Sequence, residues 1–267
     1  MVDGVHLAGD SWGRPDAPAV ILQHGGGQTR HAWQRTGQRL ADGGYYAVAF
    51  DARGHGDSDW SPDGRYGIEV MVEDLVQVIR SLGVDRAALV GASMGGITSL
   101  VAVGQEQVQA AALVLVDVAP RIDPAGADRI HAFMSQKPEG FDSVEEVAEA
   151  VRQYQPHRSH RKDVTGLRKN LRLADNGKLR WHWDPAFRKP TRSHDERRHL
   201  LESCAKNVKI PTLLVRGELS DVLSKQGAAE FQRLCPQAQY VELKRAAHMI
   251  AGDRNDAFAD AIVSFLG

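Results

Sequence analysis

Short runs of apolar residues alternate with longer amphipathic segments along most of this 267-residue chain. The runs contain almost no polar residues, which is typical of strands covered on both faces in a parallel sheet. The segments between them carry apolar residues at helical spacing, and Val72, Leu75, Val76 and Ile79 form one such stripe. Strand–helix alternation of this kind predicts an α/β layered fold.

The same alternation locates the individual elements. Strands are expected at residues 19–23, 46–50, 87–90, 112–116, 212–215 and 240–243, and helices at residues 32–41, 68–82, 94–103, 225–234 and 253–266. The alternation stops between residues 121 and 205, where helices are expected at 143–154 and 195–204 and a hairpin around Asn176-Gly177 at 171–181. We therefore expect a core of residues 1–120 and 206–267 with a mainly helical cap, residues 121–205, inserted into it.

Composition excludes several classes of protein. Lys+Arg 33 against Asp+Glu 34 leave a formal net charge of −1, so no overall field favours nucleic acid or an anionic membrane. No apolar run approaches the length of a membrane span, and the first residues lack the pattern of a signal peptide. The two cysteines, Cys204 and Cys235, are too few for a disulfide scaffold and predict a reducing, cytoplasmic location.

The pentapeptide Gly91-Ala92-Ser93-Met94-Gly95 fits the pattern G-x-S-x-G. It follows an apolar run and precedes an expected helix, which is the strand–turn–helix setting of a nucleophile elbow. Glycines on both sides of Ser93 allow a strained serine to sit close to the neighbouring strand and helix. The pattern alone is also typical of a Gly/Ser-rich turn, so Ser93 becomes a nucleophile candidate only together with partner residues.

A serine nucleophile needs a histidine as proton acceptor. His248 is the best-placed candidate, because it lies between the last expected strand and the last expected helix. Its competitors are His24, which precedes a glycine run, and His55, which lies in what we interpret as a structural turn.

A carboxylate should orient the histidine and stabilise its charged form. We favour Asp221, which follows the penultimate expected strand and gives the chain order Ser93, Asp221, His248. Asp117, at the end of the strand after the elbow, is the alternative, and Glu218 is a third candidate.

Acyl transfer also needs donors for the oxyanion of the tetrahedral intermediate. The run His24-Gly25-Gly26-Gly27 follows the first expected strand and supplies backbone N–H groups without obstructing side chains. We expect the amides of Gly26 and Met94 to form the oxyanion hole.

Taken together, these motifs resemble the α/β-hydrolase superfamily, in particular its capped esterase, haloperoxidase-like and C–C hydrolase branch. The motifs that carry the resemblance are His24-Gly25-Gly26 with Trp33 downstream, the run from Asp51 to Ser58, the elbow, the Gly217–Asp221 loop and Ala247-His248. They cover the chain from about residue 18 onwards, whereas the cap matches only in position and size.

The resemblance implies a mostly parallel eight-stranded sheet, a cap inserted after the sixth strand, no cofactor and no metal. It implies a serine hydrolase that cleaves a small to medium ester or lactone through an acyl-enzyme, with C–C bond hydrolysis and perhydrolase or haloperoxidase-like activity as alternatives on the same residues. Relatives that use an aspartate nucleophile, the haloalkane dehalogenases and epoxide hydrolases, are disfavoured because position 93 is serine. A ligand-binding receptor or scaffold with a vestigial triad is the non-enzyme alternative.

Three features of the cap allow more than one interpretation. It carries 17 Lys/Arg against 13 Asp/Glu, which suits a rim that favours anionic substrates but is more typical of a solvated face without selectivity. Trp181 and Trp183 share one strand face and are expected to pack the cap onto the core, or to line an acyl pocket. Four cap histidines, His157, His160, His194 and His199, lack the cysteine or carboxylate partners of a zinc site.

Overall fold

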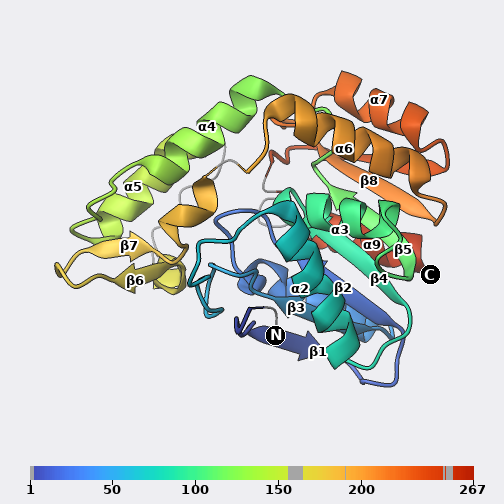
Figure 1. Cartoon of the computed structure of the whole chain (residues 1–267), viewed down its shortest axis with the longest axis horizontal. Coiled ribbons are helices and arrows are strands. Elements are labelled where there is room, and N and C mark those ends of the chain that lie inside the picture. The colour runs from blue at the N-terminus through green and yellow to red at the C-terminus, as the bar shows by residue number, and fades with distance from the viewer. Residues whose placement is uncertain (1–2, 156–164, 190, 249, 251–254) are drawn as a thin grey trace.

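The computed structural model describes residues 3–155, 165–189, 191–248, 250 and 255–267. Its centre is a seven-stranded sheet in the order β1-β3-β2-β4-β5-β8-β9 (Figure 1). Only β1 runs antiparallel, at the edge beside β3, and every other neighbouring pair is parallel. The strands are β1 (Gly9–Trp12), β2 (Ala19–Gln23), β3 (Tyr46–Phe50), β4 (Ala87–Ala92), β5 (Ala110–Val116), β8 (Thr212–Gly217) and β9 (Ala238–Leu243).

Helices cover both faces of the sheet, as the unbroken apolarity of the strands requires. Along β2, Val20 and Leu22 pack into one core cluster and Ile21 into the other, because successive side chains of a strand point to opposite faces. Figure 1 shows α2, α3, α6 and α7 on the near face and α9 on the far one, where α1 packs against α9. The helices are α1 (Gln34–Asp42), α2 (Ile68–Ser81), α3 (Met94–Gly104), α6 (His194–Asn207), α7 (Lys225–Leu234) and α9 (Asn255–Leu266), with the 3-10 turn η1 (Arg30–Trp33) before α1.

The insertion, residues 121–205, connects the neighbouring parallel strands β5 and β8. It contains α4 (Pro124–Ser135), α5 (Val144–Tyr154), η2 (Thr165–Asn170), β6 (Leu171–Leu173), β7 (Leu179–Trp181), η3 (Pro185–Arg188) and α6. The expected hairpin is confirmed, and Gly177 has a φ of 77° in its turn. Helix α4 was not expected; Asp123 caps its first turn by accepting from the Ala125 amide, and Pro124 occupies its first position.

Helix α6 ends the insertion inside the core of the molecule. Its residues Leu201, Cys204 and Ala205 belong to the core cluster of α3. The contact is close, because a Cβ added to Gly104 would lie 2.5 Å from the Cα of Cys204. The division into a core and a cap at residues 121 and 205 stays a prediction.

Two details of the expected architecture are wrong. The sheet has seven strands in the described part of the chain rather than eight, and the insertion follows the fifth strand rather than the sixth. Before β1, Asp3 and Gly4 have φ values of 54° and 76° and form a turn, and Val5 after it is a single bridge residue rather than a strand.

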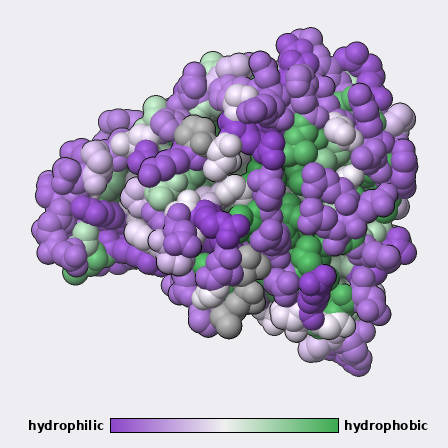
Figure 2. Space-filling view, in the orientation of Figure 1, coloured by the Kyte–Doolittle hydropathy of each residue, from purple (hydrophilic) through white to green (hydrophobic). Residues whose placement is uncertain are grey.

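Most of the face in Figure 2 is hydrophilic, with apolar residues in a strip right of centre and in smaller spots elsewhere. None of the described helices combines the length and the apolarity needed to cross a membrane.

Candidate active site

Ser93 lies in the sharp turn between β4 and α3. Its φ of 47° and ψ of −110° place a non-glycine residue in a strained conformation, of the kind that concentrates at functional sites. The turn is held from both sides: the Ser93 amide donates to the Val116 carbonyl at 3.1 Å, and the Ser93 carbonyl accepts from the Ile97 amide at 2.9 Å. The expected strand–turn–helix geometry is therefore present, with the serine at its apex.

The two glycines of the pentapeptide are sterically required. A Cβ at Gly91 would lie 2.4 Å from the carbonyl carbon of Gly95, and a Cβ at Gly95 would lie 2.5 Å from the carbonyl oxygen of Gln23. Both obstacles are backbone atoms and cannot move aside as a flexible side chain would. The glycines thus let β2, β4 and α3 approach closely enough to hold Ser93 in its turn.

His248 pairs with Asp117. Its Nδ1 lies 2.8 Å from Oδ2 of Asp117, and the two side chains are 11% and 0% exposed. Asp117 directly follows β5 and has a φ of 53°, which turns the chain after the strand ends. Its Oδ1 accepts from the Gly217 amide at 2.9 Å, and its Oδ2 also accepts from the Ser220 hydroxyl. The buried carboxylate is therefore fully hydrogen-bonded and oriented toward the imidazole.

The expected pairing of Asp221 with His248 is contradicted. Asp221 lies in the same loop as Ser220, but its carboxylate forms an ion pair with Arg129 of α4 at 2.7 Å and is 38% exposed. The third candidate, Glu218, accepts from the Arg245 amide at 2.8 Å and stabilises a turn. The correction has a geometric cause: the end of β5 lies between β4 and β8, which places Asp117 at the centre of the sheet edge.

The glycine run after β2 leaves one amide free. The Gly25 amide donates to Oε1 of Gln28 at 2.9 Å, and the Gly27 amide donates to Nε2 of His55 at 3.1 Å. Among the described residues, nothing accepts from the Gly26 amide. The Met94 amide belongs to the first turn of α3, where backbone donors lack helical partners. Gly26 and Met94 both line the pocket that contains Ser93.

Three buried histidines hold this glycine run. His24 lies 2.8 Å through Nδ1 from the Gly25 carbonyl, and its Nε2 accepts from the Ala52 amide at 3.0 Å. His55 accepts from the Gly27 amide, and His182 of the insertion accepts from the Gly56 amide at 2.6 Å while its other nitrogen faces the Gly27 carbonyl at 3.4 Å.

Each of these acceptor roles requires a neutral imidazole. Burial lowers the pKa of His24, lowers that of His55 well below its ordinary value, and lowers that of His182 to about 4. His24 and His55 therefore have structural roles here, whereas His248 lines the pocket with Ser93 and contacts a buried carboxylate. The contribution of His182 could not be inferred from sequence, because nothing in the motif Trp-His-Trp indicates a contact with the glycine run.

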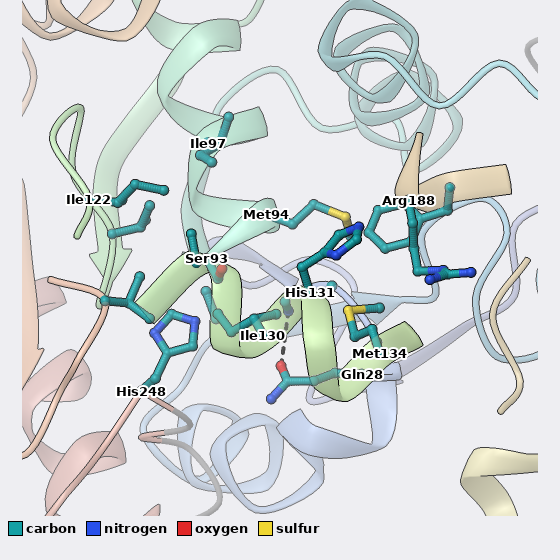
Figure 3. A pocket seen from close by; sticks show the side chains of 18 of the residues that line it. Gln28, Ser93, Met94, Ile97, Ile122, Ile130, His131, Met134, Arg188 and His248 are labelled. Carbon is teal, nitrogen blue, oxygen red and sulfur yellow. Dashed lines mark hydrogen bonds between the residues drawn. The ribbon is translucent and has the colours of Figure 1, made fainter. Parts of the chain in front are cut away.

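A cavity of about 400 Å³ opens above Ser93. Figure 3 shows Ser93 and His248 toward one end and Arg188 toward the other, with Met94, His131 and Met134 between. Trp183 lines the cavity and stacks on Trp181 with ring centroids 4.9 Å apart, so one tryptophan contributes to the pocket wall. The remaining wall is mostly apolar and includes Ile68, Met71, Ile97, Val118, Ile122, Ile130, Phe133, Phe187, Val222 and Ile250.

The cap histidines and the two cysteines are the remaining candidates from sequence, and of these His194 lines the pocket. His157 and His160 are outside the described residues, and within the described ones no group of three or more His, Cys, Asp or Glu side chains is arranged to hold a metal ion. Cys204 and Cys235 are free and buried, and burial raises the pKa of both thiols, which keeps them protonated and unreactive.

Comparisons with known proteins agree with this fold. A family model described as the alpha/beta hydrolase fold matches residues 18–254. An esterase of Mycobacterium tuberculosis, Rv0045c, is 29% identical over 262 residues, covering 94% of this chain and 83% of its own length. The sn-1-specific diacylglycerol lipase ABHD11 of Mus musculus is 28% identical and covers 93% of this chain and 81% of its own length. The solved E-2-(acetamidomethylene)succinate hydrolase superposes with a TM-score of 0.84 at 25% identity, covering 98% of this chain and 95% of that structure. These names support a hydrolase, and the chain belongs to the α/β-hydrolase family.

Proposed function

We propose that this protein is a serine hydrolase that cleaves carboxylic esters or lactones with the triad Ser93, His248 and Asp117. One observation carries the proposal: a serine at a strained turn shares a pocket with a histidine whose Nδ1 is 2.8 Å from a buried carboxylate. The preferred acid is Asp117 rather than Asp221, because Asp117 is the carboxylate that contacts the imidazole.

The reaction follows from these contacts. Asp117 accepts a hydrogen bond from the Nδ1–H of His248, which leaves Nε2 as the acceptor for the hydroxyl proton of Ser93. The Ser93 oxygen attacks the ester carbonyl, and His248 passes the proton to the leaving alkoxide. A water molecule, deprotonated by the same imidazole, then hydrolyses the acyl-enzyme and regenerates the serine.

The oxyanion hole is proposed at the amides of Gly26 and Met94. Its support is the pattern of used and unused donors: the amides on either side of Gly26 are hydrogen-bonded within the protein, whereas the Gly26 amide has no acceptor among the described residues. One such donor is typically worth about 10²–10³ in rate. The histidines that hold Gly25 and Gly27 fix the orientation of this peptide before substrate binds.

The pocket supports a small to medium substrate with an apolar part. A cavity of about 400 Å³ is in the range of small-molecule sites. Esters are the preferred class because an alkoxide leaves more readily than an amine, and the relatives include an esterase and a diacylglycerol lipase. The insertion is proposed as the cap of this site, since Met134, Trp183 and Phe187 line the pocket from it.

The test is turnover of p-nitrophenyl butyrate and p-nitrophenyl acetate, with Ser93→Ala as the control. We expect hydrolysis by the native protein, loss of turnover in the variant, and labelling of Ser93 by a fluorophosphonate probe. Absence of both turnover and labelling in a folded native protein would contradict the enzyme proposal and favour a ligand-binding role. Cleavage of carbon–carbon bonds between carbonyls, without ester cleavage, would reassign the reaction but retain the triad.

A further inference from the structure

The wall of the pocket that comes from residues 188–197 is cationic. Arg188, Lys189, Arg192 and Arg197 all line the cavity, together with His194. Among the described residues of the lining, no aspartate or glutamate accompanies them. Arg192 forms an ion pair with Glu69 of α2, whose carboxylate lies outside the lining. The cavity therefore combines an apolar body with an excess of positive charge on one side.

The other arginines of low exposure in the described part of the chain are paired with carboxylates. Arg53 donates to both oxygens of Asp74 at 2.6 and 2.7 Å. Arg216 donates to Glu242 at 2.6 Å, and Arg30 pairs with three aspartates. This pattern follows from the cost of removing a guanidinium from water, which an ion pair offsets.

Arg188 departs from this pattern. Its Nη1 donates to the Ser135 hydroxyl, and its Nε is buried without a hydrogen-bond partner. Nε and Nη2 together form the second edge of the guanidinium, whose two parallel N–H groups match the two oxygens of a carboxylate. Neither nitrogen has a partner within the described part of the protein, and Arg188 lines the cavity.

Arg197 departs from it in the same way. It lies on the first turns of α6, is half-buried, and forms no ion pair with any described residue. Burial lowers the pKa of its guanidinium, with no compensating carboxylate. Its neighbour Arg198 points elsewhere on the helix and pairs with Glu202 at 2.7 Å. Arg188 and Arg197 thus both line the cavity, and neither guanidinium forms an ion pair with a described residue.

We propose that Arg188 and Arg197 bind a carboxylate of the substrate, so that the preferred substrate is an ester with an anionic end. The inference rests on the proposed function of Ser93 and narrows its substrate class. Because Figure 3 shows Arg188 at the far end of the pocket from His248, an apolar chain should separate the carboxylate from the ester carbonyl. Monoesters of medium-length dicarboxylic acids have this form.

The first experiment compares two matched esters, mono-p-nitrophenyl adipate and p-nitrophenyl hexanoate, which differ by a carboxylate in place of a methyl group. We expect the ratio of kcat/KM for adipate over hexanoate to fall about tenfold to hundredfold in Arg188→Gln and in Arg197→Gln, the range of a lost charged hydrogen bond. Arg198→Gln, one position along the same helix, is the control and should keep the native ratio. Raised ionic strength should lower the native preference.

An unchanged ratio in both arginine variants, or a native protein that prefers the hexanoate ester, would overturn the carboxylate site. If the native protein hydrolyses neither ester, the proposed function fails instead of the carboxylate site. A binding measurement then tests the carboxylate site by itself. On the Ser93→Ala background, monomethyl adipate should raise Tm and dimethyl adipate should not, and adding Arg197→Gln should abolish the shift. Equal effects of both esters would refute the site, and stabilisation by inorganic phosphate in place of monomethyl adipate would assign it to phosphate.

Discussion

Replacing Asp117 by asparagine, which exchanges one oxygen for an NH₂ group, tests whether Asp117 or Asp221 is the acid that pairs with His248. The amide oxygen can still accept from the Gly217 amide, so the loop after β8 keeps that contact. The amide nitrogen, however, would then face Nδ1 of His248, where a carboxylate oxygen lies at 2.8 Å. An NH₂ group there donates a hydrogen bond, so Nδ1 must accept, and the imidazole proton moves to Nε2.

The expected loss follows from that tautomer. With a proton on Nε2, His248 is unable to accept the hydroxyl proton of Ser93, and the rate should fall on the scale of ~10⁴ in kcat. At 1.36 kcal/mol for each factor of ten, this corresponds to about 5 kcal/mol of lost transition-state stabilisation. Asp221→Asn removes only a partly exposed ion pair with Arg129, worth about 0–1 kcal/mol of stability, and should leave kcat close to native.

The assay is steady-state hydrolysis of p-nitrophenyl butyrate by native protein, Asp117→Asn and Asp221→Asn, with thermal melting to establish that each variant is folded. KM should change little in Asp117→Asn, because the carboxylate does not line the pocket. A folded Asp117→Asn variant with near-native kcat, beside an Asp221→Asn variant that has lost thousands-fold, would refute the assignment.

Two further predictions concern stability. Gly95→Ala places a Cβ 2.5 Å from the backbone carbonyl oxygen of Gln23, and we expect this clash to lower Tm severely. Gly83→Ala is the control, because its Cβ would meet no atom within 4 Å and it bears only the strain of its φ of 65°. An equal loss in the two variants would contradict the packing argument. The neutral state of His182, with its pKa lowered to about 4 by burial, predicts that stability falls as pH drops. The unfolded state, with a histidine pKa of about 6.5, binds the proton first, so His182 should cost about 3 kcal/mol between pH 6.5 and 4 and nothing further below. Urea unfolding of native protein and His182→Asn across this range tests it, and parallel pH profiles would exclude a contribution from this residue.

The parallel core was predictable because its strands are apolar on both faces. All six expected strands are confirmed within two residues, and the helices at 68–82 and 225–234 match α2 and α7 closely. Strand β1 was missed because Gly-Asp-Ser-Trp has no apolar run, and an antiparallel edge strand does not need one. Helix α4 was missed for another reason: it begins with Pro-Ala-Gly-Ala, which is typical of a turn, and its start is marked only by Asp123 and Pro124.

The candidate site was less accessible to sequence. Chain order is sufficient to nominate Ser93 and His248, whose catalytic roles stay proposals. The identity of the triad acid depends on where a strand ends and which way the chain then turns. The φ of 53° at Asp117 cannot be predicted from the residues around it. The unpaired arginines were equally out of reach, since a surplus of positive charge in the insertion does not say which guanidinium groups lack partners.

The contact between His182 and the glycine run limits how this protein can be re-engineered. Two imidazoles on the core and one on the insertion hold the same short loop, so the insertion completes the support of the Gly26 peptide. A chimera that exchanges the insertion for that of another family member would also exchange this support. Grafted insertions should therefore retain activity only where they supply a neutral imidazole that contacts both the Gly56 amide and the Gly27 carbonyl. Substrate range and catalytic rate should vary together in such libraries.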